Sequence, residues 1–108
     1  MERAREFYEK TLQFTFSKAS AGGAWIEYDM PGGGCLAITT LVEDLNPSSD
    51  SGGSIAFEVE NLEKLVDRLK SEGVKFKLDT FTSPVCKMAV IIDSEGNAVI
   101  LHQLHSKG

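Results

Sequence analysis

Residues 33–41, GGCLAITTL, decide the fold of this chain, because they align without gaps with residues 96–104, GNAVILHQL. Both stretches begin with a glycine that suits a turn, and both continue with the β-branched and aliphatic residues that are typical of strands. The alignment therefore predicts an internal duplication in which each copy ends with a strand.

Each copy also contains an amphipathic helix. Apolar side chains recur at i, i+3, i+4 and i+7 in two places, first at Ala4, Phe7, Tyr8 and Thr11 and later at Leu62, Leu65, Val66 and Leu69. Asn61 suits the N-cap of the second helix and Gly73 suits the left-handed position just beyond its end. The second helix is therefore predicted to run from near residue 62 to near residue 72.

Short segments rich in β-branched and aromatic residues follow each helix, as in antiparallel hairpins. The predicted strands are 14–18, 24–30 and 35–41 in the first half, 75–78, 86–92 and 98–104 in the second half, and 54–59 before the second helix. The turns before the two closing strands are residues 31–34, PGGG, and residues 93–97, DSEGN. The second half thus opens with a strand that the first half lacks. Either the natural chain has lost that strand, or the recorded chain starts at an internal methionine.

Composition places the chain among ordinary globular proteins. It has 108 residues, 42% hydrophobic and 25% charged, which suits a single domain. The formal net charge of -5 argues against a nucleic-acid partner, and no apolar run is long enough to cross a membrane. Because charged residues follow Met1 directly, no secretory signal is predicted and the expected location is cytoplasmic. Cys35 and Cys86 lack the spacing of a zinc or redox motif and are expected to be reduced thiols.

Three stretches carry a resemblance to a known family. Residues 5–12, REFYEKTL, followed by Phe14, resemble the first-helix signature of the vicinal oxygen chelate superfamily, which includes glyoxalase I, bleomycin-resistance proteins and extradiol dioxygenases. Residues 54–62, SIAFEVENL, resemble its fifth strand and helix entry, and residues 93–101, DSEGNAVIL, resemble its terminal hairpin.

The resemblance implies an α+β fold, in which two βαβββ units form a curved, mostly antiparallel sheet around a cleft, here with the first strand missing. The expected single domain consists of a first unit at 1–42, a linker at 43–53 and a second unit at 54–108. It also implies a homodimer. The alternative is another small α+β domain such as a ferredoxin-like sandwich, against which three strands after each helix count.

Catalytic members of the family hold a divalent metal with His and Glu side chains in the cleft. The corresponding positions here are Ser54, Ile100 and Ala37, and the fourth ligand would lie on the missing strand. Isoleucine and alanine cannot coordinate a cation, and a serine hydroxyl alone is a poor ligand. His102 and His105 are three apart on a strand and point to opposite faces. The sequence therefore predicts no metal and no cofactor.

The candidate ligand-binding residues follow from strand alternation. If positions 54 and 100 face the cleft, then Ala56, Glu58, Ala98 and His102 also face it, while Ile55, Phe57, Val99 and Leu101 pack under the helices. The set predicted to bind a ligand is Trp25, Cys35, Thr39, Ser54, Glu58 and His102.

Each candidate also has a plain structural interpretation. Glu58 and His102 are either an acid/base pair or ordinary polar residues of a solvated sheet face. Trp25 is either a stacking surface or an aromatic of the core or of a dimer interface. Phe81, in a predicted loop at 79–84, either covers the cleft or sits at a hairpin tip. Cys35 has no basic neighbour in sequence, so it is expected to fill space.

The leading hypothesis is a metal-independent protein that binds an unidentified small molecule. The first alternative is a metal-dependent lyase, isomerase or dioxygenase of the same superfamily. A further alternative is a non-catalytic module that dimerises through its incomplete sheet, since an unpaired edge can accept another strand.

Overall fold

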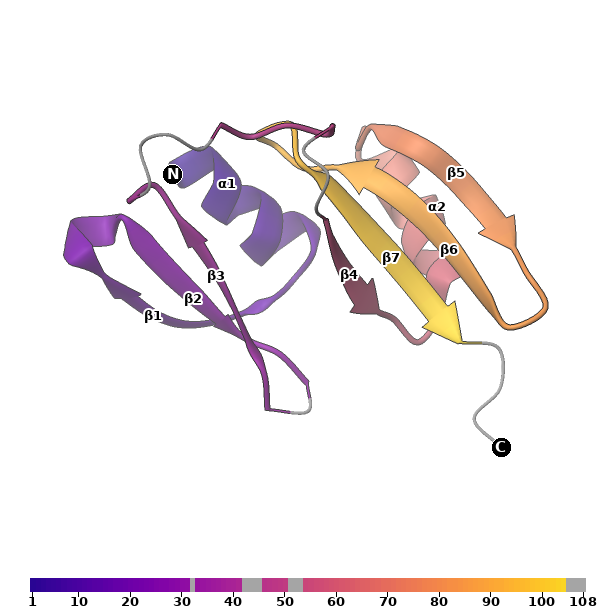
Figure 1. Ribbon diagram of the computed structural model, residues 1–108, viewed down its shortest axis with the longest axis horizontal. Helices are drawn as coiled ribbons and strands as arrows, with labels where there is room; N and C mark the ends of the chain where they lie inside the picture. Colours follow the sequence, from indigo (N-terminus) through magenta and orange to yellow (C-terminus); the bar gives the residue numbers. More distant parts are fainter. Residues whose placement is uncertain (32, 42–45, 51–53, 105–108) are drawn as a thin grey trace. The chain divides into compact units, whose positions relative to one another are not determined.

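A computed structural model of the chain describes residues 1–31, 33–41, 46–50 and 54–104. The chain divides into two compact units, Met1–Asn46 and Pro47–Gly108, and each is described by itself (Figure 1). No helix in the described part of the chain is long and apolar enough to cross a membrane.

The first unit opens with a helix that changes its winding. Helix α1, Glu2–Glu6, continues directly into the π-helical segment η1, Phe7–Thr11. Its wider turns are visible in the bond from Leu12 N–H to Phe7 C=O, at 2.9 Å, which spans five residues. Phe7, Tyr8 and Leu12 are the buried side chains of this helical stretch.

A three-stranded antiparallel sheet completes the first unit. Its strands are β1 at Thr15–Ser20, β2 at Trp25–Asp29 and β3 at Cys35–Thr39, in the order β1-β2-β3, with the short 3₁₀ segment η2 at Ala21–Gly23 between the first two. Ile26 and Tyr28 of β2 are completely buried, and the Tyr28 ring lies 6.3 Å from the ring of Tyr8. The core of this unit therefore lies between the helical stretch and one face of the sheet.

The second unit is a four-stranded sheet covered by one helix. The strands are β4 at Ile55–Glu58, β5 at Phe76–Thr82, β6 at Cys86–Ile92 and β7 at Ala98–Leu104, in the order β4-β7-β6-β5 (Figure 1). Strand β4 runs parallel to β7, and the other neighbours are antiparallel. Helix α2, Leu62–Ser71, buries Leu62, Val66 and Leu69. Ala89, Ile91, Val99 and Leu101 are buried on the sheet, each at 1% exposure or less.

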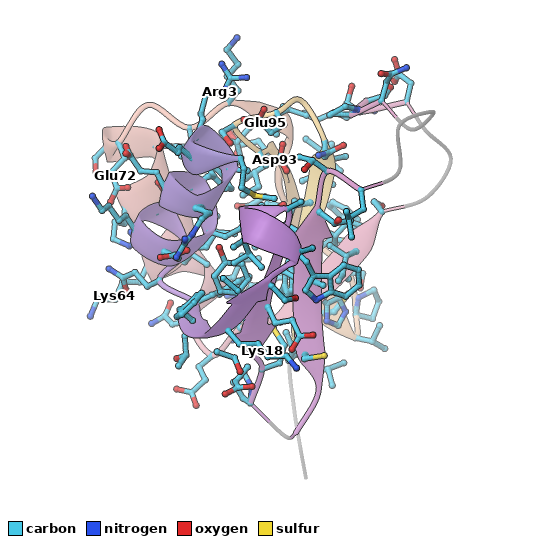
Figure 2. The ribbon with its side chains drawn as sticks, turned by 90° about the vertical axis from the view of Figure 1, so that its left-hand side faces the viewer. Arg3, Lys18, Lys64, Glu72, Asp93 and Glu95 are labelled. Carbon is cyan, nitrogen blue, oxygen red and sulfur yellow. The ribbon has the colours of Figure 1, made fainter. Side chains whose placement is uncertain are left out.

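The two ends of helix α2, and the turn between strands β6 and β7, are as the sequence predicts. The Asn61 side chain accepts a hydrogen bond from Lys64 N–H at 3.1 Å, and Gly73 has a φ of 82°. In the turn between β6 and β7, the Asp93 carboxylate accepts bonds from the N–H groups of Glu95 and Asn97, both at 2.9 Å. Asp93 and Glu95 are labelled at this turn in Figure 2.

Several expectations need correction. Residues 79–82 belong to β5 rather than to a loop, so Phe81 is a strand residue paired with Met88. Two register shifts in the β5–β6 pairing, between Phe76 and Leu78 and between Leu78 and Phe81, interrupt the alternation that marks a strand in sequence. Ile55 is 42% exposed rather than packed in the core, because β4 is the edge strand of its sheet. Residues 42–45 and 51–53 of the predicted linker, and His105, lie outside the described residues.

Candidate functional site

The register of the second unit sorts its side chains onto two faces. Directly opposite residues share a face, and Ala56, Ile100, Val90 and Leu78 form one such row across all four strands. The neighbouring row contains Glu58, His102, Met88 and Phe81. Both rows lie on the face opposite to the buried Val99 and Leu101, which means that α2 does not cover them.

This open face carries a pocket of about 600 Å³. Its apolar lining comes from the strands and its polar lining comes mainly from residues 49, 50 and 54, and the full set is Ser49, Asp50, Ser54, Lys77, Leu78, Val90, Ala98 and Ile100. A concave, largely apolar surface with a few polar groups at its margin is the usual form of a small-molecule site.

The charged residues of the pocket bind each other. The Lys77 ammonium donates to the Ser49 carbonyl and lies 3.1 Å from Asp50 Oδ1. The predicted linker position Asp50 is therefore part of the pocket wall, although its side chain is 85% exposed. Because one ammonium faces one carboxylate, this end of the pocket carries no net charge.

Glu58 and His102 form a contact at the C-terminal ends of β4 and β7. Parallel pairing places the two residues opposite each other, and Glu58 Oε1 lies 2.6 Å from His102 Nδ1. The second carboxylate oxygen, Oε2, accepts a bond from Leu104 N–H at 2.9 Å. When Nδ1–H donates to the carboxylate, Nε2 of a neutral ring is left with its lone pair. Such a ring can accept a proton or a hydrogen bond from a ligand.

The first unit presents a separate set of candidate residues. Trp25 pairs with Thr39, Glu27 with Ala37 and Asp29 with Cys35, so Trp25, Thr39 and Cys35 share one face of that sheet. The Trp25 indole N–H donates to Glu27 Oε1 at 2.9 Å, and Cys35 and Thr39 are exposed. Cys35 and Cys86 are both free thiols.

The six candidate residues thus fall into two groups. Trp25, Cys35 and Thr39 lie together in the first unit, while Ser54, Glu58 and His102 lie in the second. Ser54 lines the pocket, and Glu58 and His102 lie one row away on the same face. Sequence reasoning missed Leu78, Val90 and Lys77. The first two could have been found by extending the alternation at Ile100 across the two neighbouring strands.

The positions that the resemblance assigns to metal ligands do not supply a suitable donor set. Ile100 lines the pocket with an apolar side chain, and Ser54 contributes one neutral hydroxyl. Ala37 has no donor atom on its side chain. Among the described residues, no group of three or more His, Cys, Asp or Glu side chains is arranged to hold a metal ion. The residues present therefore do not fit the divalent metal of the catalytic relatives.

Comparisons with solved structures define the class of fold. A putative glyoxalase family protein from Bacillus anthracis superposes with a TM-score of 0.80 and 19% identity, over 95% of this chain and 83% of that one. TnmS3, an antibiotic-binding protein from Streptomyces sp. CB03234, superposes with a TM-score of 0.80 and 21% identity, over 95% of this chain and 85% of that one. Lactoylglutathione lyase from Agrobacterium tumefaciens gives a TM-score of 0.74 and 14% identity, over 94% and 84% of the two chains. These likenesses define a glyoxalase-type α+β fold, as the sequence predicts.

The family follows from the sequence itself. The family model of the Glyoxalase/Bleomycin resistance protein/Dioxygenase superfamily matches residues 1–101, and the chain belongs to this superfamily. No curated protein matches the chain significantly.

Proposed function

We propose that the protein binds a small molecule without the help of a metal ion, on the open face of the second unit. The observation that carries this proposal is Ile100. It lines the pocket at a position where catalytic relatives are expected to present a glutamate, so an apolar contact stands where a metal ligand would be. The antibiotic-binding activity named for TnmS3 supports binding as a function that this fold can perform.

The side chains that line the pocket indicate which kind of ligand would fit it. Leu78, Val90 and Ile100 offer aliphatic contact to the body of a compound. Lys77 is engaged by Asp50, so neither charge is free to require an oppositely charged ligand. A compound with a flat or compact apolar body and no net charge fits this lining best.

His102 provides a polar anchor at one side of the same face. Its Nδ1 is held by Glu58 at 2.6 Å, which fixes the ring and leaves Nε2 to accept a hydrogen bond. A hydroxyl or N–H group on the ligand would bind there. Since the His102 side chain is 30% exposed, a ligand reaches it without a change in the sheet.

The test has a metal arm and a ligand arm. After dialysis against Mn²⁺, Ni²⁺ or Zn²⁺, elemental analysis should find far less than one tightly bound metal per chain. A panel of uncharged bicyclic aromatic compounds, half of them with a hydroxyl group, is then titrated into methyl-labelled protein. Shifts should concentrate on the methyl groups of Leu78, Val90 and Ile100, and His102→Gln should weaken only the hydroxylated compounds.

Two variants, each of which replaces an aliphatic side chain with aspartate, distinguish binding in the pocket from binding elsewhere on the surface. Ile100→Asp should abolish binding of every compound in the panel, because a carboxylate replaces an apolar wall. Val85→Asp, at a side chain that is 67% exposed and outside the pocket lining, should leave binding unchanged. Stoichiometric metal retention, or binding that ignores Ile100→Asp in a folded variant, would contradict the proposal.

A second candidate function is a lyase or isomerase reaction, and the Glu58–His102 contact is the observation that favours it. A carboxylate that orients an imidazole is a common arrangement for acid/base catalysis. The assay is turnover of a 2-oxoaldehyde thiol adduct, with and without added divalent metal. Turnover that His102→Gln abolishes would favour this second candidate.

A cytoplasmic location and a homodimer remain predictions of the sequence. Sedimentation at several protein concentrations measures the oligomeric state directly.

A further inference from the structure

Residues 48–50, named the strap from here on, are attached to the sheet of the second unit at two points. At the first point, the Ser48 N–H donates to Asn97 Oδ1 at 3.1 Å, in the turn before β7. At the second point, the Lys77 ammonium of β5 binds the other two strap residues. Because β6 lies between β7 and β5 in the sheet, the strap is held on both sides of β6.

The attachment at Asn97 is firmly supported. The backbone N–H and the side-chain Nδ2 of Asn97 both donate to the Asp93 carboxylate, at 2.9 and 3.1 Å. Asp93 is itself buried, at 6% exposure. The Asn97 side chain is therefore fixed in the orientation in which its oxygen accepts the bond from Ser48.

A bulge in β5 creates the second attachment. Phe76 pairs with Ile91 and Leu78 pairs with Val90, so the pairing advances by two residues along β5 and by one along β6. Lys77 is the extra residue, and such a residue changes the direction of the side chains around it. Strict alternation would direct two consecutive side chains to opposite faces, yet Lys77 and Leu78 both line the pocket. The bulge thus brings an ammonium to the open face beside an apolar wall.

This second attachment is easily broken. The Lys77 and Asp50 side chains are 43% and 85% exposed. An ion pair between exposed side chains favours the attached state by a factor of only about two to five. Since Ser49 and Asp50 line the pocket, release of the strap from Lys77 would widen the pocket at this margin.

We propose that the strap is a gate to the pocket, with Asn97 as its fixed end and Lys77 as the latch that releases when a ligand enters or leaves. This inference rests on the proposed binding function and adds control of that function by ionic strength. Dissolved salt screens an exposed ion pair and therefore weakens the latch. Because the proposed ligand carries no net charge, salt acts on the latch rather than on an attraction between the ligand and the pocket.

The first experiment measures the latch without any ligand, through hydrogen exchange of the Ser48 amide. Lys77→Met keeps an apolar stem of similar length but lacks the ammonium, and it should speed this exchange about two- to fivefold. About 1 M NaCl, at which the Debye length is about 3 Å, should speed exchange in the wild type but not in Lys77→Met. The matched control is Lys87→Met, which breaks the Lys87–Glu63 ion pair outside the pocket lining and should leave exchange at Ser48 unchanged.

The second experiment measures the width of the pocket, again without a ligand. An uncharged nitroxide in solution broadens the signals of the methyl groups that it can approach. The methyl signals of Val90 and Ile100, which line the pocket, should broaden more in Lys77→Met than in the wild type or in Lys87→Met.

The third experiment uses indole, an uncharged bicyclic compound, as the ligand. Line shapes of the Val90 and Ile100 methyl signals during a titration give the association and dissociation rate constants. A gate limits entry and exit alike, so Lys77→Met should raise both rate constants by the same factor of about two to five. Loss of an ordinary contact with the ligand would instead raise the dissociation rate constant alone.

Several results would overturn the proposal. Exchange at Ser48 that ignores Lys77→Met would show that no latch exists, and equal nitroxide broadening in wild type and Lys77→Met would show that the strap does not control the pocket. A rise in the dissociation rate constant alone would make Lys77 a ligand contact. If indole fails to bind to the wild type, that result counts against the proposed function, while the two ligand-free experiments still decide whether the strap is a gate.

Discussion

Removing the hydroxyl of Tyr28 should destabilise the first unit by an amount that depends on pH. Tyr28 is completely buried, and its hydroxyl donates to Glu9 Oε2 at 2.9 Å, while Arg5 Nε donates to the same oxygen at 2.7 Å. A hydrogen bond to a charged group contributes about 1.5–3 kcal/mol to folding. In Tyr28→Phe the Glu9 carboxylate still has its ion pair with Arg5, and it is 27% exposed to solvent. The substitution should therefore lower the free energy of unfolding by an amount near the bottom of this range, about 1.5 kcal/mol at neutral pH.

The alkaline dependence follows from the pKa of Tyr28. Burial, together with the hydrogen bond to Glu9, raises this pKa from 10.0 to about 12. A raised pKa adds stability that is complete below the pKa of the unfolded chain and that declines as the pH rises toward the folded value. By pH 11 the wild type should have lost roughly 1.4 kcal/mol through this residue, which nearly cancels its advantage over Tyr28→Phe.

The contribution of Glu9 to folding stability depends on pH in the opposite direction, because it is lost in acid rather than in alkali. The bond from Arg5 lowers the pKa of Glu9, so the carboxylate adds stability above its ordinary pKa and loses that contribution as the pH falls through the lowered value. The difference in unfolding free energy between wild type and Tyr28→Phe should therefore shrink at both low and high pH.

The assay is urea unfolding of wild type, Tyr28→Phe, Glu9→Gln and the double variant between pH 3 and pH 11. Tyr8 is present in all four proteins, so its own titration cancels. The double-mutant cycle should assign most of the Tyr28→Phe cost to the pair. Equal stability of wild type and Tyr28→Phe at pH 7, or a difference that stays constant up to pH 11, would refute the reasoning.

Three further substitutions test the second unit by thermal and urea unfolding. Asn61→Ala should cost about 1 kcal/mol because Lys64 N–H loses its cap, whereas Asn61→Ser should cost much less, and equal losses would argue against capping. Leu101→Ala should cost about 2–5 kcal/mol because it opens a cavity under α2, and a loss below 1 kcal/mol would mean that this strand face is not the core. Asp93→Ala should cost about 2 kcal/mol, since the partly buried turn amides of Glu95 and Asn97 lose their acceptor, and an unchanged midpoint would exclude this role.

Much of the fold is readable from local sequence signals. Helix α2 was predictable because the apolar spacing, the cap at Asn61 and the left-handed Gly73 all agree on the same limits. The closing strands were predictable because each follows a turn with glycine in a position that favours positive φ, as Gly33 and Gly96 do. Where independent local preferences agree, tertiary context has little to change.

The strand β5 shows why other parts were not predictable. Its register shifts place Asp79 and Thr80 in a strand without the regular alternation of polar and apolar residues. The pairing that keeps these residues extended is with β6, and it depends on contacts that sequence periodicity does not encode. The same holds for η1, where the wider helical turn is not marked by any residue type.

The candidate site was predictable only along single strands. Alternation from Ser54 and Ile100 correctly grouped Glu58 with His102, because both residues lie on paired strands with a fixed register. It did not reach Lys77 or Asp50, which join the pocket through a contact between β5 and the segment before β4. Such contacts depend on tertiary structure rather than on local pattern.

The unequal burial of the two repeats has a consequence for how the molecule comes apart. Leu36 and Ile38 are half-buried, whereas their equivalents Val99 and Leu101 are almost completely buried. Less apolar contact therefore stabilises the sheet of the first unit. We expect partial unfolding to begin in β1, β2 and β3, with early protease cuts there, while the four-stranded sheet that bears the pocket stays intact. The pocket would then persist in a molecule whose first unit has already unfolded.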